Sequence, residues 1–264
     1  MPYYDAHLHL QLLPEIPGEH ELNEYRDAGI RKMVLNGCEE QDWDTVASLA
    51  RNDLIRPAYG LHPWHVMSRS DAWYEQLVEY LDRSPNALIG EIGLDKWIRT
   101  SSLKEQIPVF KKQLDLARER EIPPSIHCLQ AWGTLLEILR SRGPFSKGFL
   151  LHSYGGPAEM VESFVKLGAY FSLSGYFARS DKTQKLEAFK AIPKDRLLIE
   201  TDAPDMLPPP ELRAMEEVDR EGKPVNHPLN LIRIYEWAAK LRGLEPEAFQ
   251  QQIEANFLTL FGSG

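Results

Sequence analysis

The sequence predicts a single-domain α/β protein, residues 1–264, with a (β/α)8 TIM barrel fold. Eight short segments rich in apolar and β-branched residues recur along the chain, and segments with helical spacing separate them. The apolar residues of the short segments do not alternate with polar ones, which is typical of parallel strands buried on both faces. Strand and helix repeated to a count of eight favour a closed barrel over an open sheet.

The order of the elements follows from these patterns. Helical spacing is clear at Ile107, Phe110 and Leu114, and the last helix is expected from Pro246 to Phe261. The strands are expected near residues 3–9, 32–36, 56–60, 87–92, 124–128, 148–152, 169–174 and 197–201.

A long connection that contains several prolines follows Asp202. It includes residues 208–210 and then Pro224 and Pro228. Because proline lacks a backbone N–H donor, we expect no strand pairing in this connection. A connection of this length on the catalytic face of a barrel favours a lid or substrate wall, and a plain surface excursion is the alternative.

Composition excludes several classes of protein. A net charge of -9 and a pI near 5.4 argue against an extended grip on duplex nucleic acid, although they allow contact with a strand end. Two cysteines, Cys38 and Cys128, are too few for a disulfide framework and fit a reducing compartment. No leader pattern and no uncharged run of ~18 residues is present. We therefore expect a cytoplasmic protein with neither a membrane nor an obligate protein partner.

Histidines and carboxylates stand at the carboxyl ends of five predicted strands, where barrel enzymes place their working residues. On a strand, the period of two turns His7 and His9 toward the same face. Such ionisable groups would be costly to bury without a partner or a metal. The sequence therefore predicts a metal centre built from His7, His9, Glu91, His127, His152 and Asp202.

The donor types limit the choice of metal. Four imidazoles and two carboxylates suit Mg²⁺, Mn²⁺, iron or Zn²⁺, whereas copper(I) and iron–sulfur clusters prefer thiolates. Six candidate ligands exceed the number that one tetrahedral ion uses. We therefore expect two divalent ions that share a bridging carboxylate, which Glu91 supplies.

Five motifs together resemble the TatD family of metal-dependent hydrolases, a branch of the amidohydrolase superfamily. They are Asp5-Ala6-His7-Leu8-His9, Gly90-Glu91-Ile92-Gly93-Leu94-Asp95, Ile126-His127, His152 and Glu200-Thr201-Asp202-Ala203-Pro204. The resemblance spans nearly the whole chain and implies a (β/α)8 fold with deoxyribonuclease activity, often on strand ends. It also implies one ion near His7, His9 and Asp202, and a second near His127 and His152, with Glu91 as the bridge.

The chain differs from the family pattern in its candidate substrate contacts. Trp64 stands where a second histidine usually follows the proline of the strand-three motif, and no arginine follows His127 closely. Lys96 and Arg179, in loops on the catalytic face, are the cations that we expect to bind phosphate. His62 has two interpretations, a phosphate contact or a cap of strand three.

The expected reaction is hydrolysis of a phosphodiester in DNA or in a small molecule. A water activated between the ions is the nucleophile, and Asp202 orients it and accepts its proton. Relatives that act on amides or lactones generally bridge their ions with a modified lysine, so Glu91 favours the phosphodiesterase branch. Hydrolysis of a small amide, lactone or phosphoester, and a catalytically silent metal-binding scaffold, are the alternatives.

Overall fold

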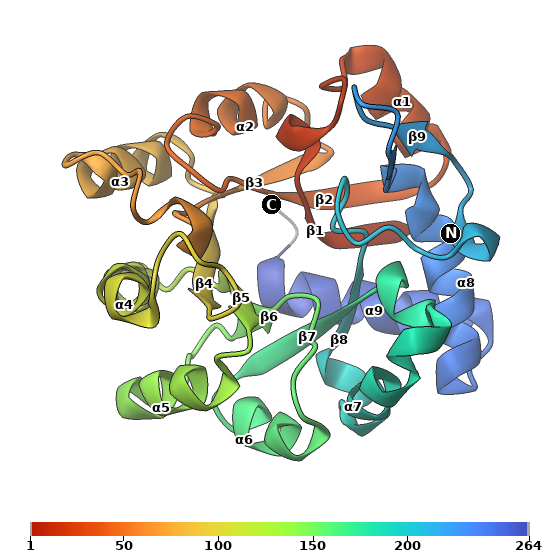
Figure 1. Ribbon diagram of the computed structural model, residues 1–264. Helices are drawn as coiled ribbons and strands as arrows, with labels where there is room; N and C mark the ends of the chain where they lie inside the picture. Colours follow the sequence, from red (N-terminus) through yellow and green to blue (C-terminus); the bar gives the residue numbers. More distant parts are fainter. Residues whose placement is uncertain (1, 263–264) are drawn as a thin grey trace.

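The computed structural model describes residues 2–262, apart from the side chains at positions 183 and 184. Eight parallel strands form one sheet in sequential order, and helices surround them (Figure 1). The predicted TIM barrel is confirmed. The strands are β1 (Tyr3–Leu8), β2 (Ile30–Asn36), β3 (Ile55–Tyr59), β4 (Leu88–Asp95), β5 (Pro124–Leu129), β6 (Phe149–Leu151), β7 (Ala169–Ser174) and β8 (Leu197–Glu200).

Two helix ends lie at residues that the sequence marks well. At the start of α4, Ser102 and Glu105 form a capping box, and Gly243, with a φ of +63°, caps the carboxyl end of α8. The predicted last helix is confirmed with its bounds. The helices are α1 (Glu19–Asp27), α2 (Trp43–Leu49), α3 (Trp73–Arg83), α4 (Leu103–Glu119), α5 (Trp132–Arg142), α6 (Val161–Val165), α7 (Leu186–Ala191), α8 (Leu231–Arg242) and α9 (Pro246–Phe261).

The first and last strands meet at a seam that closes the barrel. The backbone N–H of Asp202 donates to the carbonyl of His7 at 3.0 Å. A side chain adds to this closure, because the fully buried carboxyl group of Asp5 accepts from the backbone N–H of Thr201 at 3.0 Å and from its hydroxyl at 2.6 Å. The two ends of the sheet are therefore joined beside the metal-ligand candidates of β1.

Close approach of two strands depends on a glycine in β4. Gly93 has a φ of +157°, and a Cβ there would lie 2.0 Å from the carbonyl oxygen of His127 in β5. Only glycine fits this position, because any side chain would force the strands apart. The contact sets Glu91 of β4 beside the histidine of β5.

The long connection after β8 contains a short hairpin of β9 (Glu217–Val218) and β10 (Pro224–Val225). The expectation that its prolines forbid strand pairing was wrong at Pro224, which stands opposite Val218. In an isolated two-stranded ladder, proline can turn the side without a donor toward the open edge. Within residues 2–262, no helix is both long and apolar enough to cross a membrane.

Candidate metal centre

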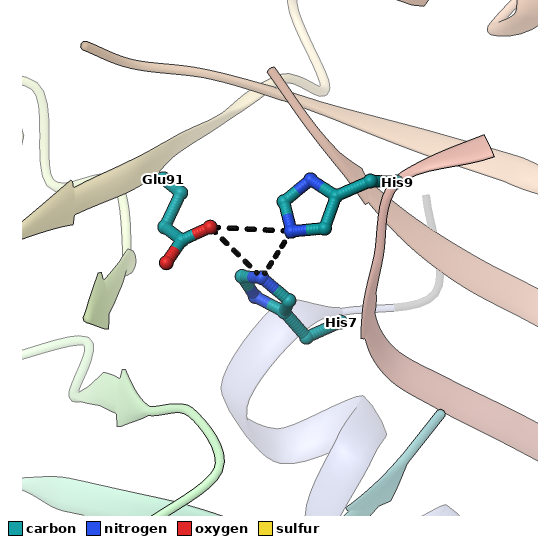
Figure 2. Close-up of side chains that lie close together, drawn as sticks. All are labelled: His7, His9 and Glu91. Atoms are coloured by element: carbon teal, nitrogen blue, oxygen red, sulfur yellow. Dashed lines mark hydrogen bonds and ion pairs between the residues drawn. The ribbon is translucent and has the colours of Figure 1, made fainter. Parts of the chain in front are cut away.

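The six predicted ligands converge at the carboxyl ends of the strands, and Glu91 lies between two groups of them. We call His7, His9 and Asp202 the seam half, because they come from the strands that close the barrel. One oxygen of Glu91, Oε2, lies 3.3 Å from His7 Nε2 and 3.2 Å from His9 Nε2, and these two nitrogens are 3.1 Å apart (Figure 2). Asp202 Oδ1 lies 3.7 Å and 3.5 Å from the same nitrogens.

The other oxygen of Glu91 faces the second pair of imidazoles, His127 and His152, which we call the open half. Glu91 Oε1 lies 3.1 Å from His127 Nδ1 and 2.9 Å from His152 Nε2, and these nitrogens are 3.2 Å apart. The side chain of His127 is 16% exposed, whereas that of His7 is fully buried. His127 is therefore the most exposed of the six ligand candidates, and solvent reaches the centre at this residue.

Local backbone geometry explains why these side chains meet. His7 lies in β1 and His9 directly follows its last residue, and Glu91 and His127 lie within neighbouring strands. Asp202 follows β8 with a φ of 57°, a left-handed conformation that aspartate adopts more readily than most residues. This turn brings its carboxylate to the seam half.

The spacing of the donor atoms fits a divalent metal. Four ligands at about 2.1 Å from a zinc ion lie about 3.4 Å from one another. Distances of 2.9 to 3.7 Å separate the facing nitrogen and oxygen atoms in both halves. Imidazole nitrogens and carboxylate oxygens are also the donors that such ions prefer.

In the seam half, neutral groups hold the second nitrogen of each imidazole. His9 Nδ1 is 2.8 Å from the backbone carbonyl of Asn36, and His7 Nδ1 is 2.8 Å from the hydroxyl of Ser125. The carbonyl can only accept, so His9 carries its proton on Nδ1 and leaves Nε2 free to bind a metal.

In the open half, carboxylates face the second nitrogens. His127 Nε2 is 3.3 Å from Asp95 Oδ2, and His152 Nδ1 is 3.8 Å from Glu200 Oε1. Glu200 is fully buried and accepts a short hydrogen bond from Ser172. An imidazole backed by a carboxylate is a more basic metal ligand than one backed by a neutral group.

Burial and neighbouring charges set the pKa values of the two carboxyl groups among the ligands. Burial acts to raise the pKa of Glu91, but the imidazoles of His152, His62 and His7 outweigh it and hold this pKa well below its usual range. Burial raises the pKa of Asp202 to about 6. Glu91 is thus an anion throughout the neutral range, the form in which a carboxylate can bind a metal.

The structure places the three predicted substrate contacts differently. His62 Nε2 lies 3.3 Å from Glu91 Oε1, while His62 Nδ1 accepts from the backbone N–H of Trp64 at 3.2 Å. His62 therefore caps the turn after β3 and also faces the metal centre. Lys96 is exposed, and Arg179 pairs with Asp181, so the described contacts bring neither cation to the ligands.

Two supporting residues were missed in the sequence although their spacing reveals them. Asp95 is four residues after Glu91 on β4, and Ser125 is two residues before His127 on β5. The period of two puts each of them on the same face as its ligand. The carbonyl of Asn36 leaves no such signal, because any residue carries one.

A family model described as TatD related DNase matches residues 4–262 of the chain. The chain belongs to this family. The resemblance to TatD proteins that the motifs indicated is therefore confirmed. Among its relatives, a 3'-5' ssDNA/RNA exonuclease TatD from Erwinia billingiae is 33% identical over 242 residues, which are 89% of each chain.

Another TatD relative is the uncharacterized metal-dependent hydrolase YjjV of Escherichia coli, 30% identical over 98% of this chain and 97% of the relative. The crystal structure of YjjV superposes with a TM-score of 0.86 at 28% identity and covers 98% of this chain and 97% of that one. A TatD family hydrolase from Entamoeba histolytica has a TM-score of 0.83 at 17% identity, over 100% of this chain and 99% of that one, and shares the fold.

Proposed function

We propose that this TatD-family protein is a hydrolase that cleaves phosphodiester bonds at the 3′ ends of single-stranded DNA or RNA with two divalent cations, Mg²⁺, Mn²⁺ or Zn²⁺. The position of Glu91 carries the proposal, because each of its oxygens faces two imidazole nitrogens. The polarity and the substrate are those in the printed name of the Erwinia relative.

Divalent cations bound in the two halves would lower the pKa of water from about 15.7 toward about 7 and stabilise negative charge on the phosphate. In the proposed site, Asp202 accepts the proton of the attacking water. Burial raises its pKa to about 6, so the carboxylate is ionised at neutral pH and is able to accept a proton. Glu91 holds the two ions at a fixed distance from each other in the proposed site.

His62 is assigned to hold a phosphate oxygen. Because His62 Nδ1 accepts a hydrogen bond from Trp64, the ring proton is on Nε2, which faces the centre. Burial lowers the pKa of His62 to about 4, so the ring is neutral at pH 7 and acts as a hydrogen-bond donor. It adds no charge to a site that already holds cations.

Shortening of labelled oligonucleotides tests the proposal. Single-stranded DNA and RNA carrying a 5′ label should shorten stepwise from the 3′ end with Mg²⁺ or Mn²⁺, and EDTA should stop the reaction. Asp202→Asn should lower the rate at least about 100-fold, because it removes the proton acceptor. His62→Asn should slow the reaction, whereas His20→Asn, at an exposed histidine of α1, should leave it unchanged.

Other outcomes would assign the centre to another class. Turnover of amides or lactones without turnover of phosphodiesters would support a different amidohydrolase activity. If native protein and Asp202→Asn were equally inert on all three substrate types, the centre would belong to a binding scaffold.

A further inference from the structure

Exposed apolar side chains gather on the face of the barrel that holds the metal centre. Among the described residues, ten large apolar side chains are exposed, and eight of them lie at the ends of strands or in the loops that follow. Leu244 and Leu258 are the other two. The eight are Leu12, Ile16, Trp64, Met67, Trp97, Leu129, Met215 and Val218.

Two of these residues are tryptophans, and one buried carboxylate holds the side chain of the first and the backbone of the second. Trp64 is 43% exposed and Trp97 is 64% exposed. The indole N–H of Trp64 donates to Asp95 Oδ2 at 2.7 Å, and the backbone N–H of Trp97 donates to Asp95 Oδ1 at 2.8 Å. The amide of Gln106 fixes Asp95 in turn, with two hydrogen bonds of 2.8 Å to its backbone.

The same carboxylate links the tryptophans to the metal centre. Asp95 Oδ2 is also 3.3 Å from Nε2 of His127, a ligand candidate of the open half. The ring of His62 lies 5.2 Å from that of Trp64 and 4.6 Å from that of His127, centre to centre. The indole of Trp64 and the backbone of Trp97 are therefore both attached, through Asp95, to the side of the centre where His127 lies.

Basic residues flank one of the two indoles. Lys96 directly precedes Trp97 and Arg99 follows it closely, and the side chains of both are exposed. An exposed aromatic ring with cations beside it suits a nucleotide, whose base stacks on the ring while its phosphate pairs with the cation. The sheet of the barrel supports this arrangement because Asp95 is the last residue of β4.

We propose that Trp64 and Trp97 form a stacking platform for the bases of the single strand whose end lies in the open half. The inference rests on the proposed function and names how that substrate is bound. Stacking on aromatic rings also explains how a chain of net charge -9 can hold a polyanion, because each base contributes without a matching positive charge.

Binding of a fluorescein-labelled single strand, followed by anisotropy with Mg²⁺, tests the platform. The Asp202→Asn protein serves as the background so that the strand is not cut. Trp97→Ala should weaken binding about tenfold, the size expected for the loss of one stacked base. Trp64→Ala should act in the same direction, and Leu244→Ala, at an exposed apolar residue away from this face, is the matched control and should change nothing.

A strand of the same length with abasic sites at its 3′ end separates stacking from other effects. It should bind more weakly than the complete strand, and the two tryptophan variants should not weaken it further. Equal loss with both strands, or unchanged affinity in Trp97→Ala, would overturn the platform. Circular dichroism on each variant checks that the fold is intact.

Failure of the proposed function has a different signature. It would show as no nucleotide release by the native protein with any divalent cation. The dependence of binding on bases and on Trp97 is measured without turnover, so the two results are independent.

Discussion

Glu91 lies between the two halves of the candidate metal centre, which differ in the groups that face the second nitrogens of their imidazoles. In the seam half, a carbonyl and a hydroxyl back His9 and His7, and His7 is fully buried. In the open half, Asp95 and Glu200 face the imidazoles, and His127 reaches solvent. Similar ligand types thus have neutral groups behind them in the seam half and carboxylates behind them in the open half.

This difference should give the two halves different metal affinities. A carboxylate behind an imidazole raises its basicity and strengthens its bond to a metal. A metal bound in the open half would therefore be held by the more basic imidazoles, beside the side chain of His127 that reaches solvent. The seam half depends on the closure of the barrel for its geometry, because His7 and His9 lie at the end of β1 and Asp202 is the second residue after β8.

Replacement of Glu91 should lower the metal affinity of both halves. Glu91→Gln takes the negative charge from both at once, so we expect metal affinity in each to fall by more than about 100-fold, beyond the loss typical of a supporting residue. Isothermal titration with Mn²⁺ measures both. Retention of one full-affinity site would show that the halves do not share Glu91.

The geometry of the seam half should depend on the contacts that close the barrel. Asp5→Ala leaves three buried donors without their acceptor, two from Thr201 and the backbone N–H of His7. We expect a loss of about 3 kcal/mol in the free energy of unfolding, measured with urea in EDTA. An unchanged urea midpoint would show that Asp5 does not hold the seam.

The pH dependence of the free energy of unfolding gives a second test of Asp5. Burial raises its pKa from 3.8 to about 8, so between these values the folded protein holds a proton that the unfolded chain has lost. The contribution of this group to stability therefore falls as pH rises from about 4 to about 8. Asp5→Asn cannot titrate, and it should gain in stability relative to the native protein between pH 5 and pH 8.

Supporting residues should matter more in the open half than in the seam half. Asp95→Asn removes the carboxylate behind His127 and should weaken one metal site about 10-fold to 100-fold. Ser125→Ala removes a neutral partner of His7 and should cost less. Titration of both variants with Mn²⁺ compares them, and equal losses would contradict the assigned difference.

Acid should lower the metal affinity of the seam half through the carboxyl group of Asp202, which has no counterpart in the open half. A metal binds the ionised form of Asp202, and with a pKa of about 6 this carboxyl group takes up a proton as pH falls below that value. Affinity in the seam half should then fall about tenfold per pH unit below pH 6 from this group alone. Asp202→Asn should reduce the slope of affinity against pH between pH 5 and pH 6, and an unchanged slope would contradict this.

The sequence predicted the barrel and the convergence of the ligands because both depend on strand periodicity and strand ends. The position of Glu91 between two pairs of imidazoles follows from the same rule. The turn that makes Asp202 face the seam half depends on a left-handed backbone conformation, which residue type alone does not specify.

Contacts made by loops were harder to predict. The assignment of Lys96 and Arg179 to phosphate rests on their place in the chain and stays a prediction, because the path of a loop depends on its tertiary neighbours, such as Asp181 beside Arg179. Pro224 pairs in a hairpin because the edge of that hairpin does not need its missing donor. The role of Asp95 was accessible from its spacing, but its link to Trp64 needed the fold.

Because the seam joins the two ends of the sheet, metal binding there should stabilise the closure of the barrel. Asp5 and Thr201, which meet there, are 196 residues apart in the chain, and the ligands of the seam half span the same junction. A cation bound by these ligands would stabilise the closed barrel, since it binds only when the first and last strands are in place. Hydrogen exchange of the amides in β1 and β8 should therefore slow together on loading, while the helices far from the junction change little.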